Sequence, residues 1–439
     1  MEILFKKLGI NGEGIGYDKR IPVFCDGVLP GEKAEVEIIL DHGSYRKARC
    51  EKLLQRSSER TDPVCKNQKR CRSCPMMILS YDAQQKYKKE LLEEALYKYG
   101  NVKRDLVRNI RGSELRTGYR NQFKLPVREK DGKLITGMYL PDSNAFINIR
   151  HCEIHDPLLE KTKHDVLDVL NTHHMRAYDG RRKQGIRYLV MRILDGKIQC
   201  TLITGRDRLS ESLINDLISV EPVISLYQSK NTIKQSAGIF GSDPVLLAGE
   251  EYLTTKSGDL QLFLSPESFY QLNEPQAQKL YETAVSKIDP CNIIVEAYCG
   301  IGAMSLMAHA KAETVIGIEN IPSAVRNAEM NARENGIDNV RFMCMDAADG
   351  LLKTARTQQV DTLIADPPRS GMDDRMLEAI MKTDIKKIIY ISCNPATLAK
   401  NLKVLKQKYL LRTVIPFDMF PQTPHIESIA VLSLPGSKQ

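Results

Sequence analysis

The chain has no apolar run near the roughly 20 residues that a membrane helix needs, which argues against an integral membrane protein. Its first residues, Met1 to Lys6, are too few and too charged for the apolar core of a secretory signal, and no Arg- and Ser-rich transit segment follows. Internal repeats and low-complexity tracts are also missing. We therefore expect a soluble, cytoplasmic protein with no membrane partner, and nothing in the sequence indicates an obligate protein partner.

The chain also lacks the even number of cysteines that a full set of disulfides needs, because it has 11. In a chain that looks cytosolic, an odd and scattered set argues against a disulfide framework and favours metal-binding or catalytic roles. A length of 439 residues predicts two or three domains. The formal charge of +8, from 63 basic and 55 acidic side chains, favours a polyanionic partner but also fits ordinary solubility.

Three different patterns of apolar and turn-forming residues predict three domains, at residues 1–56, 57–262 and 263–439. In the first, short apolar runs alternate with glycine turns, which predicts a small OB-like β-barrel with basic residues at its far end: Arg46, Lys47 and Arg49. The second is predicted to be α+β, with a surface helix over 81–99, a helix over 164–173 and strands over 188–193, 198–203 and 260–264.

The third domain alternates short apolar strands with helical segments, which predicts a parallel, doubly wound α/β sheet of Rossmann-like type. The predicted strands are Ile293–Val295, Thr314–Ile318, Val340–Cys344, Thr362–Ala365 and Ile388–Ser392. Ligands of such sheets bind at the carboxyl ends of the strands. Functional residues are therefore expected at those strand ends.

The turn after the first of these strands, Val295 to Gly302, has two glycines and opens a helix. Glu319 ends the next strand, at a distance that suits an acid binding ribose hydroxyls. The third glycine of a dinucleotide fingerprint is missing, which favours a nucleoside cofactor such as S-adenosylmethionine over NAD. Asp346 closes the third strand and is a candidate acceptor for an adenine amine, although a structural turn with a surface glutamate would give the same pattern.

Two further strand ends carry candidate groups. Asp366-Pro367-Pro368-Arg369-Ser370-Gly371 follows the fourth strand, where two prolines fix φ, hold Asp366 at the crevice and leave local carbonyls as acceptors. Cys393 follows the fifth strand, with a helix expected from Thr397. Its thiol is predicted to face the same edge, although a free cysteine is often only a small buried hydrophobe, and the prolines alone could mark a plain turn.

Five ordered motifs together resemble the uridine-5 RNA methyltransferase family, a class that uses S-adenosylmethionine. They are Ser268–Asn273, Tyr298–Gly302, Asp366–Gly371, Ser392–Pro395 and His425–Glu427. The likeness spans nearly the whole chain, because Gly12–Tyr17 with Leu29–Glu32 looks like the RNA-binding TRAM barrel, and it is nearest to the family's 23S rRNA branch. One departure is Glu296, where many relatives carry aspartate.

The resemblance implies a role for each matched residue. Gln271, Tyr298, Glu319, Asp366 and, on weaker grounds, Asp346 would contact S-adenosylmethionine. Cys393 would be the nucleophile, because thiolate addition at C6 of uracil makes C5 enolate-like and able to attack a sulfonium methyl. A base must then remove the C5 proton, and Glu427 is the candidate, although it could merely begin a strand.

Cys65, Cys71 and Cys74 form C-x5-C-x2-C, and Cys152 offers a fourth thiolate. Four thiolates suit a [4Fe-4S] cluster or tetrahedral zinc, and resemblance to the rRNA branch favours the cluster, which would make the central domain an iron–sulfur domain. Five further cysteines are predicted to be buried structural thiols: Cys25, Cys50, Cys200, Cys291 and Cys344.

The sequence therefore predicts a 23S rRNA (uracil-5-)-methyltransferase acting on a uridine in a loop or flipped from its stack. Candidate RNA contacts are the basic residues near the cysteines, Lys66, Lys69, Arg70 and Arg72, and a second set, Arg116, Arg120 and Lys124, beside aromatic Tyr119 and Phe123. Two alternatives stay open: a tRNA (uracil-5-)-methyltransferase, and a catalytically inactive RNA-binding iron–sulfur protein.

Overall fold

The computed structural model describes residues 1–140, 143, 145–234 and 238–436. The chain forms two compact units, of which the first comprises Met1–Arg116, Asp366–Met381 and Lys387–Gln439, and the second comprises Thr117–Ala365 and Lys382–Lys386. Within the described residues, no helix combines the length and the apolar character needed to cross a membrane.

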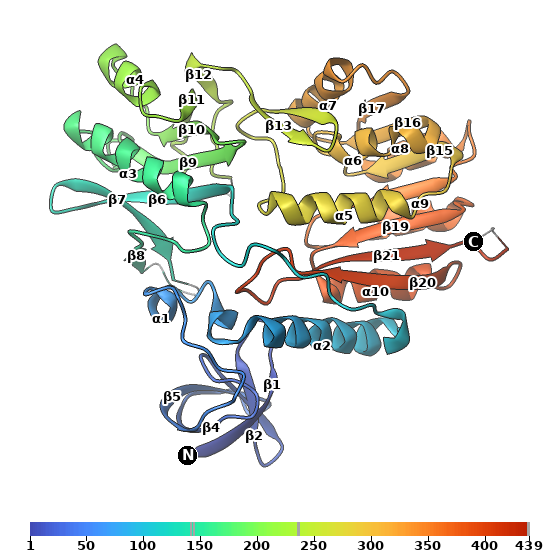
Figure 1. Cartoon of the computed structure of the whole chain (residues 1–439), viewed down its shortest axis with the longest axis horizontal. Helices are drawn as coiled ribbons and strands as arrows, with labels where there is room; N and C mark the ends of the chain where they lie inside the picture. The colour runs from blue at the N-terminus through green and yellow to red at the C-terminus, as the bar shows by residue number, and fades with distance from the viewer. Residues whose placement is uncertain (141–142, 144, 235–237, 437–439) are drawn as a thin grey trace. The chain divides into compact units, whose positions relative to one another are not determined.

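The first unit begins with a closed five-stranded barrel in the order β1-β2-β3-β5-β4 (Figure 1). Its strands are β1 (Glu2–Leu8), β2 (Gly14–Asp18), β3 (Ile21–Cys25), β4 (Lys33–Asp41) and β5 (Arg46–Gln55). Alternate residues such as Ile3, Phe5 and Val23 point inward and form a small core. Gly16 is required in β2, because a Cβ there would lie 2.3 Å from a side-chain carbon of Ile3. The predicted barrel is confirmed.

The rest of the first unit is made of helices and antiparallel strands. They come from two parts of the sequence, one before and one after the residues of the second unit. Its helices are α1 (Gln68–Cys71), α2 (Tyr81–Gly100), α9 (Asp374–Lys382) and α10 (Pro395–Leu405), with short 3-10 turns at Pro75–Ile78 and Arg104–Leu106. Its strands β19 (Lys387–Ser392), β20 (Leu410–Phe417) and β21 (Glu427–Ser433) pair in the order β19-β21-β20, antiparallel throughout.

Helix α2 confirms the helix predicted over 81–99, but it is not a simple surface helix. Ser80 caps its first turn by accepting from the Ala83 N–H, and the Leu92 and Leu96 side chains are buried. Near its end it packs closely on α10, since a Cβ on Gly100 would lie 2.8 Å from the Ala399 carbonyl oxygen. The charged face that the sequence assigned to solvent includes Lys88, which is fully buried.

The second unit contains a seven-stranded sheet in the order β12-β11-β10-β9-β6-β7-β8. Its strands are β6 (Gln122–Lys130), β7 (Lys133–Tyr139), β8 (Phe146–Asn148), β9 (Ile186–Leu194), β10 (Lys197–Thr204), β11 (Val223–Lys230) and β12 (Val245–Gly249). Helices α3 (Pro157–Thr172) and α4 (Glu211–Ile218) pack on one face (Figure 1). The α+β prediction is confirmed, but α3 begins seven residues before the predicted 164, where Asp156 caps it and Pro157 opens it.

The second unit also holds four parallel strands in the order β17-β16-β15-β18: β15 (Cys291–Ala297), β16 (Ala312–Glu319), β17 (Val340–Cys344) and β18 (Thr362–Ala365). Helices α5 (Glu274–Ser286), α6 (Ala303–Met307), α7 (Pro322–Glu334) and α8 (Ala347–Ala355) accompany them, with a 3-10 turn at His309–Lys311 and a hairpin of β13 (Leu253–Ser257) and β14 (Leu260–Leu264). The parallel arrangement predicted for these four strands is confirmed. Strand β20 was not predicted, and a strand at Glu427 was considered only as the alternative to a catalytic role.

Candidate active site

The nucleophile candidate lies in a short turn between β19 and α10. Ser392 ends the strand, and the Asn394 side chain accepts from the Ala396 N–H at 3.0 Å and so caps α10. Pro395 opens that helix two residues before the predicted start at Thr397, which suits its fixed φ and missing N–H. Cys393 is therefore held at the carboxyl end of a buried strand by a capped helix, partly buried as a catalytic thiol requires.

The base candidate reaches the same place by antiparallel pairing. Strand β21 pairs with β19 so that Ser428 lies opposite Ser392. Glu427 precedes Ser428 and Cys393 follows Ser392, so both residues lie directly beyond the last paired position, where the Glu427 charge acts on the Cys393 thiol. Glu427 does begin a strand, as the simpler interpretation held, and it is also a buried carboxyl beside the thiol.

Three ionisable groups of the first unit lie at this edge, and the charges of the two carboxyl groups act on the thiol. Burial, then the charges of Glu427 and Asp366, raise the pKa of the Cys393 thiol to about 11, against an opposing effect of Arg369. Burial and the Asp366 charge hold the pKa of Glu427 well above its usual value, and burial raises the pKa of Asp366 to about 7. In the free protein the thiol therefore keeps its proton, and Glu427, once ionised, is a strong base.

The loop after Asp366 is fixed to α10. Gly371 has a φ of +80°, and a Cβ there would lie 2.7 Å from the Asn401 amide oxygen, which itself accepts from the Met372 N–H. The Arg369 carbonyl accepts from the Asn394 amide at 3.2 Å, and the Pro368 carbonyl accepts from the Gly371 N–H at 2.8 Å. Each of these two carbonyls thus accepts a hydrogen bond from within this region of the first unit, and the predicted role of local carbonyls as ligand acceptors stays a prediction.

The glycine-containing turn in the second unit has an unusual backbone. Positive φ angles occur at Tyr298, Gly300 and Gly302, at 65°, 53° and 78°. A positive φ is rare for a tyrosine, so this segment is strained, and strained residues cluster at binding sites. The Gly300 N–H donates to the Glu319 carboxylate at 3.1 Å. Successive N–H groups in such a turn, followed by the start of α6, can cradle a polar ligand.

Glu319 ends β16 as predicted, Asp346 lies two residues past the end of β17, and backbone donors hold both. The second Glu319 oxygen accepts from the N–H groups of Asn320 and Ile321 at 2.8 and 3.0 Å. Asp346 caps α8 by accepting from the Ala348 and Asp349 N–H groups at 3.1 and 3.3 Å. Glu319 is therefore rigidly presented at the turn, whereas Asp346 has a structural role that its position near a strand end did not reveal.

The departure at Glu296 also has a local explanation. Its buried carboxylate accepts a hydrogen bond from the Ser305 hydroxyl of α6, within the second unit. The longer side chain thus ties the end of β15 to the helix that follows the turn.

Gln271 lies in the second unit, on a segment for which the sequence predicted no helix or strand. The Gln271 backbone oxygen accepts from the Asn121 side-chain amide at 3.0 Å, and the Asn121 backbone N–H donates to the Leu272 carbonyl. Buried Arg192 donates to the Ser268 carbonyl, and the Asn327 amide oxygen accepts from the Ser268 hydroxyl at 2.9 Å. Asn121 and Arg192 hold this motif in place, and no local sequence signal marks either.

The cysteines divide into several environments. Cys65, Cys71 and Cys74 are partly buried in the first unit, and Cys152 lies in the second, where burial raises its pKa to about 11. Across the residues with described positions, no group of three or more His, Cys, Asp or Glu side chains is arranged to hold a metal ion. Cys25 and Cys200 are buried as predicted, Cys50 and Cys291 only partly, and the prediction is wrong for exposed Cys344, which ends an outer strand.

The candidate RNA contacts are only partly accessible. Tyr119 and Phe123 are buried, so the predicted stacking of bases on them is wrong, because both face the protein interior. At the barrel, Arg46 pairs with Asp18 and Asp41, and Arg49 pairs with Glu37 and Glu51, which offsets much of that basic charge. Near the cysteines the basic side chains are exposed as predicted: Lys66, Lys69, Arg70 and Arg72.

Taken separately, the parallel strands with their glycine turn have the architecture of a nucleoside-binding methyltransferase domain, and the barrel is of the kind that binds RNA. Comparison with known proteins agrees. Residues 80–434 match the family model described as tRNA (uracil-5-)-methyltransferase, and residues 1–49 match the TRAM domain model. The chain belongs to the tRNA (uracil-5-)-methyltransferase family and is thus an S-adenosylmethionine-dependent RNA methyltransferase.

Relatives match along nearly their whole length. A Bacillus anthracis protein named as an uncharacterized RNA methyltransferase is 35% identical, over 98% of this chain and 96% of its own. One from Enterococcus faecalis with the same description is 33% identical, over 99% and 97%. The crystal structure of Pyrococcus abyssi tRNA (uracil-54, C5)-methyltransferase with S-adenosyl-L-homocysteine superposes with a TM-score of 0.79, covering 98% of this chain and 100% of that one at 22% identity, which shows a shared fold.

Proposed function

We propose that this enzyme transfers a methyl group from S-adenosylmethionine to C5 of a uridine in 23S rRNA, with Cys393 as nucleophile and Glu427 as base. The observation that carries the proposal is the register of β19 and β21, which sets the two residues directly beyond the last paired position at one strand end. C6 and C5 of uracil are bonded neighbours, so a thiol that attacks one and a carboxylate that deprotonates the other must lie side by side.

Cys393 acts first in this mechanism. Loss of its proton gives a thiolate that adds to C6, and the electron pair of the C5=C6 bond then becomes nucleophilic at C5. C5 takes the methyl group from the sulfonium of the cosubstrate, which leaves as S-adenosylhomocysteine. Because a thiol of high pKa gives a strongly nucleophilic thiolate, the raised pKa of Cys393 favours attack once the proton has gone.

Glu427 acts second. Its carboxylate removes the remaining C5 proton, the C5=C6 bond re-forms, and the Cys393 thiolate is expelled, so the enzyme is regenerated and 5-methyluridine is released. A carboxylate whose pKa lies well above the ordinary range is suited to this step, because basicity rises with pKa.

The cosubstrate contacts are proposed for Gln271, Tyr298, Glu319, Asp346 and Asp366. Support is strongest at the positive-φ turn and at Glu319, whose carboxylate is already oriented by three backbone N–H groups. An oriented acid suits two ribose hydroxyls. Support is weakest for Asp346, because its carboxylate also caps α8.

The choice of 23S rRNA rests on the segment with Cys65, Cys71 and Cys74, which resembles the rRNA branch of the family. A second candidate is a tRNA (uracil-5-)-methyltransferase, favoured by the fold shared with the archaeal tRNA enzyme, which covers 98% of this chain. Because that coverage includes most of the barrel region, the barrel by itself does not separate the two substrates. The inactive alternative is disfavoured by the retained Asp366, Cys393 and Glu427.

We further propose a [4Fe-4S] cluster, with zinc as the alternative, on Cys65, Cys71, Cys74 and Cys152. The thiol chemistry fits either group, but the described side chains form no ready-made metal site, so the assignment rests on resemblance and no step of the reaction depends on it. Iron and acid-labile sulfide in protein purified without oxygen would support the cluster, and stoichiometric zinc without sulfide would replace it.

The first experiment incubates the purified protein, and separately its Cys393→Ala variant, with S-adenosylmethionine and either a 23S rRNA or a tRNA transcript. Mass spectrometry of digested RNA then measures 5-methyluridine. We expect product in 23S rRNA only, and only with intact Cys393. Product in tRNA alone would move the substrate and keep the chemistry, whereas product formed by the variant would overturn the covalent mechanism.

A further inference from the structure

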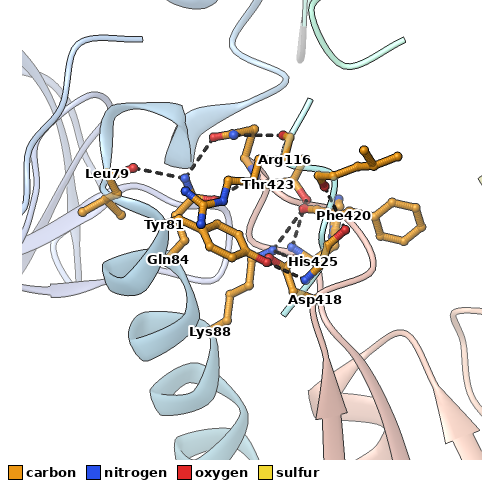
Figure 2. A network of polar contacts seen from close by, with 12 residues as sticks. Leu79, Tyr81, Gln84, Lys88, Arg116, Asp418, Phe420, Thr423 and His425 are labelled. Carbon is orange, nitrogen blue, oxygen red and sulfur yellow. Dashed lines mark hydrogen bonds and ion pairs between the residues drawn. The ribbon is translucent and has the colours of Figure 1, made fainter. Parts of the chain in front are cut away.

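Helix α2 presents a row of buried polar side chains to the connection between β20 and β21, residues 418–426, hereafter the β20–β21 connection. Figure 2 shows Lys88 of this helix pointing toward Asp418 and Phe420, and the Gln84 amide beside the Leu79 carbonyl. All of these residues lie in the first unit. The β20–β21 connection ends at the residue before Glu427, so it leads directly into the base.

The strongest contact is a buried ion pair. The Lys88 ammonium lies 2.5 Å from an Asp418 carboxylate oxygen, both side chains are 0% exposed, and the ammonium also donates to the Phe420 carbonyl at 3.0 Å. Burial lowers the pKa of Lys88, and the neighbouring Asp418 opposes that shift. One lysine thus fixes both the first residue of the β20–β21 connection and a carbonyl two residues further on.

A second set of contacts fixes the middle of the same segment. The Gln84 amide donates to the Gln422 amide oxygen at 2.9 Å, and the Gln422 N–H donates back to the Gln84 amide oxygen at 2.9 Å. The Gln422 amide also donates to the Arg116 carbonyl at 3.0 Å. Gln422 has a φ of 72°, an unfavourable conformation for a residue other than glycine, so these bonds hold a strained turn.

The other end of α2 contacts the helix that follows the nucleophile. Gly100 packs against Ala399 of α10, and the Lys406 ammonium donates to the Asn101 carbonyl at 2.6 Å. Asn394, directly after Cys393, caps that same helix. One rigid element therefore braces both the segment before the base and the helix after the nucleophile.

Stability alone does not account for the Lys88–Asp418 pair. Removing two charges from water costs about as much as their attraction returns, and well-packed apolar side chains often serve as well. What a buried, doubly hydrogen-bonded lysine does supply is one defined position for the groups around it.

We propose that Lys88 and Gln84 are positioning residues for the base, which hold Glu427 beside Cys393 through the β20–β21 connection. This inference rests on the proposed function. Addition of Cys393 to C6 and methyl transfer to C5 do not require Glu427, whereas proton removal from C5 and release of the thiolate do. Loosening the connection should therefore slow the second half of the reaction more than the first and let the covalent enzyme–RNA adduct accumulate.

The test uses three variants of the full-length protein. Lys88→Met removes the ammonium, Lys88→Met/Asp418→Asn removes both charges so that no lone buried charge opposes folding, and Gln84→Met breaks the amide pair without changing charge. The matched control is Lys86→Met, an exposed lysine of the same helix that pairs with Glu59. Thermal melting selects the folded variants, and the RNA is whichever transcript the wild type methylates.

Two measurements separate the steps. Adduct formation on 5-fluorouridine RNA, which cannot lose its C5 fluorine as a proton, reports addition and methyl transfer on a denaturing gel. Turnover on uridine RNA reports the whole cycle. We expect the folded variants to form the 5-fluorouridine adduct as fast as wild type, to turn over about 10- to 100-fold more slowly, and to accumulate adduct on uridine RNA. The Lys86→Met control should match wild type in adduct formation, in turnover and in the amount of adduct on uridine RNA.

An equal fall in adduct formation and turnover would overturn the proposal, because it would indicate general damage, and so would unchanged turnover in the double and Gln84→Met variants. If Lys88→Met fails to fold, those two variants decide the question. Failure of the proposed function looks different, since the wild-type protein itself would then form neither 5-methyluridine nor the 5-fluorouridine adduct.

Discussion

The two halves of the chemistry are built in opposite ways. The strand end of the first unit relies on buried, ionisable side chains, where burial and the charges of Glu427 and Asp366 raise the pKa of the Cys393 thiol and the Asp366 charge also raises that of Glu427. The turn of the second unit relies on backbone shape, with positive φ at Tyr298, Gly300 and Gly302 and a carboxylate held by N–H groups. The difference suits their tasks. Covalent addition and proton removal need acids and bases with shifted pKa values, whereas cosubstrate binding needs donors and acceptors in fixed positions.

The largest effect should come from Cys393→Ala. Without the thiolate, C5 stays too poor a nucleophile, so turnover should fall by about 10⁴-fold or more. Binding of S-adenosylmethionine should be retained, because the turn and Glu319 are unchanged. Mass spectrometry of the RNA and isothermal titration of the cosubstrate measure the two separately, and a parallel loss of cosubstrate binding would contradict the division of labour.

Glu427→Gln should come next. Loss of the base should slow turnover by roughly 10²- to 10⁴-fold and trap the methylated adduct between Cys393 and RNA. The same change removes the larger of the two charges that raise the pKa of Cys393, so the thiol should ionise at lower pH. Denaturing gels detect the adduct, and a slow variant without adduct would mean that Glu427 acts before proton removal.

A pair of glycine variants tests the backbone-built turn. An added Cβ at Gly302 would lie 2.6 Å from the Phe342 ring, whereas one at Gly300 meets nothing within 4 Å, and both positions have positive φ. Gly302→Ala should lower the free energy of unfolding by roughly 2–4 kcal/mol and weaken cosubstrate binding. Gly300→Ala should cost only about 1–2 kcal/mol. Urea denaturation and titration measure both, and equal effects would show that crowding is unimportant.

The smallest effect should be the response of Cys393 to Asp366→Asn. Above about pH 7 the Asp366 carboxylate is ionised and raises the pKa of Cys393, so its removal should lower that pKa and speed alkylation by iodoacetamide at pH 8. Below pH 7 the difference should vanish, because wild-type Asp366 is then protonated. Peptide mass spectrometry isolates Cys393 from the other thiols, and an unchanged profile would contradict the coupling.

Local sequence patterns predicted most elements because each pattern has one dominant cause. The strands Val340–Cys344 and Thr362–Ala365 were predicted at their observed bounds, since short apolar runs between helices indicate buried parallel strands. The glycine turn, Glu319 and Cys393 were found because they follow such strands. Helix α3 begins earlier than its apolar spacing predicts, because Asp156 caps its first turn and Pro157 opens it.

Other features depended on contacts between residues far apart in the sequence. Tyr119 and Phe123 look like stacking platforms beside basic residues, and only packing shows that they are buried. Lys88 lies on a helix with many charges, and nothing local reveals that Asp418, 330 residues later, removes it from solvent. The three-domain boundaries and the cysteine ligands stay predictions.

The sequence by itself determined the barrel, the parallel strands and the candidate chemistry, because apolar period, glycine turns and ordered motifs are local properties. Tertiary structure alone decided that the final strand runs antiparallel to β19, which brings Glu427 beside Cys393. It also decided that these groups have shifted pKa values and that α2 braces the β20–β21 connection. The physical reason is that register, burial and electrostatic coupling arise only when distant segments exclude water from one another.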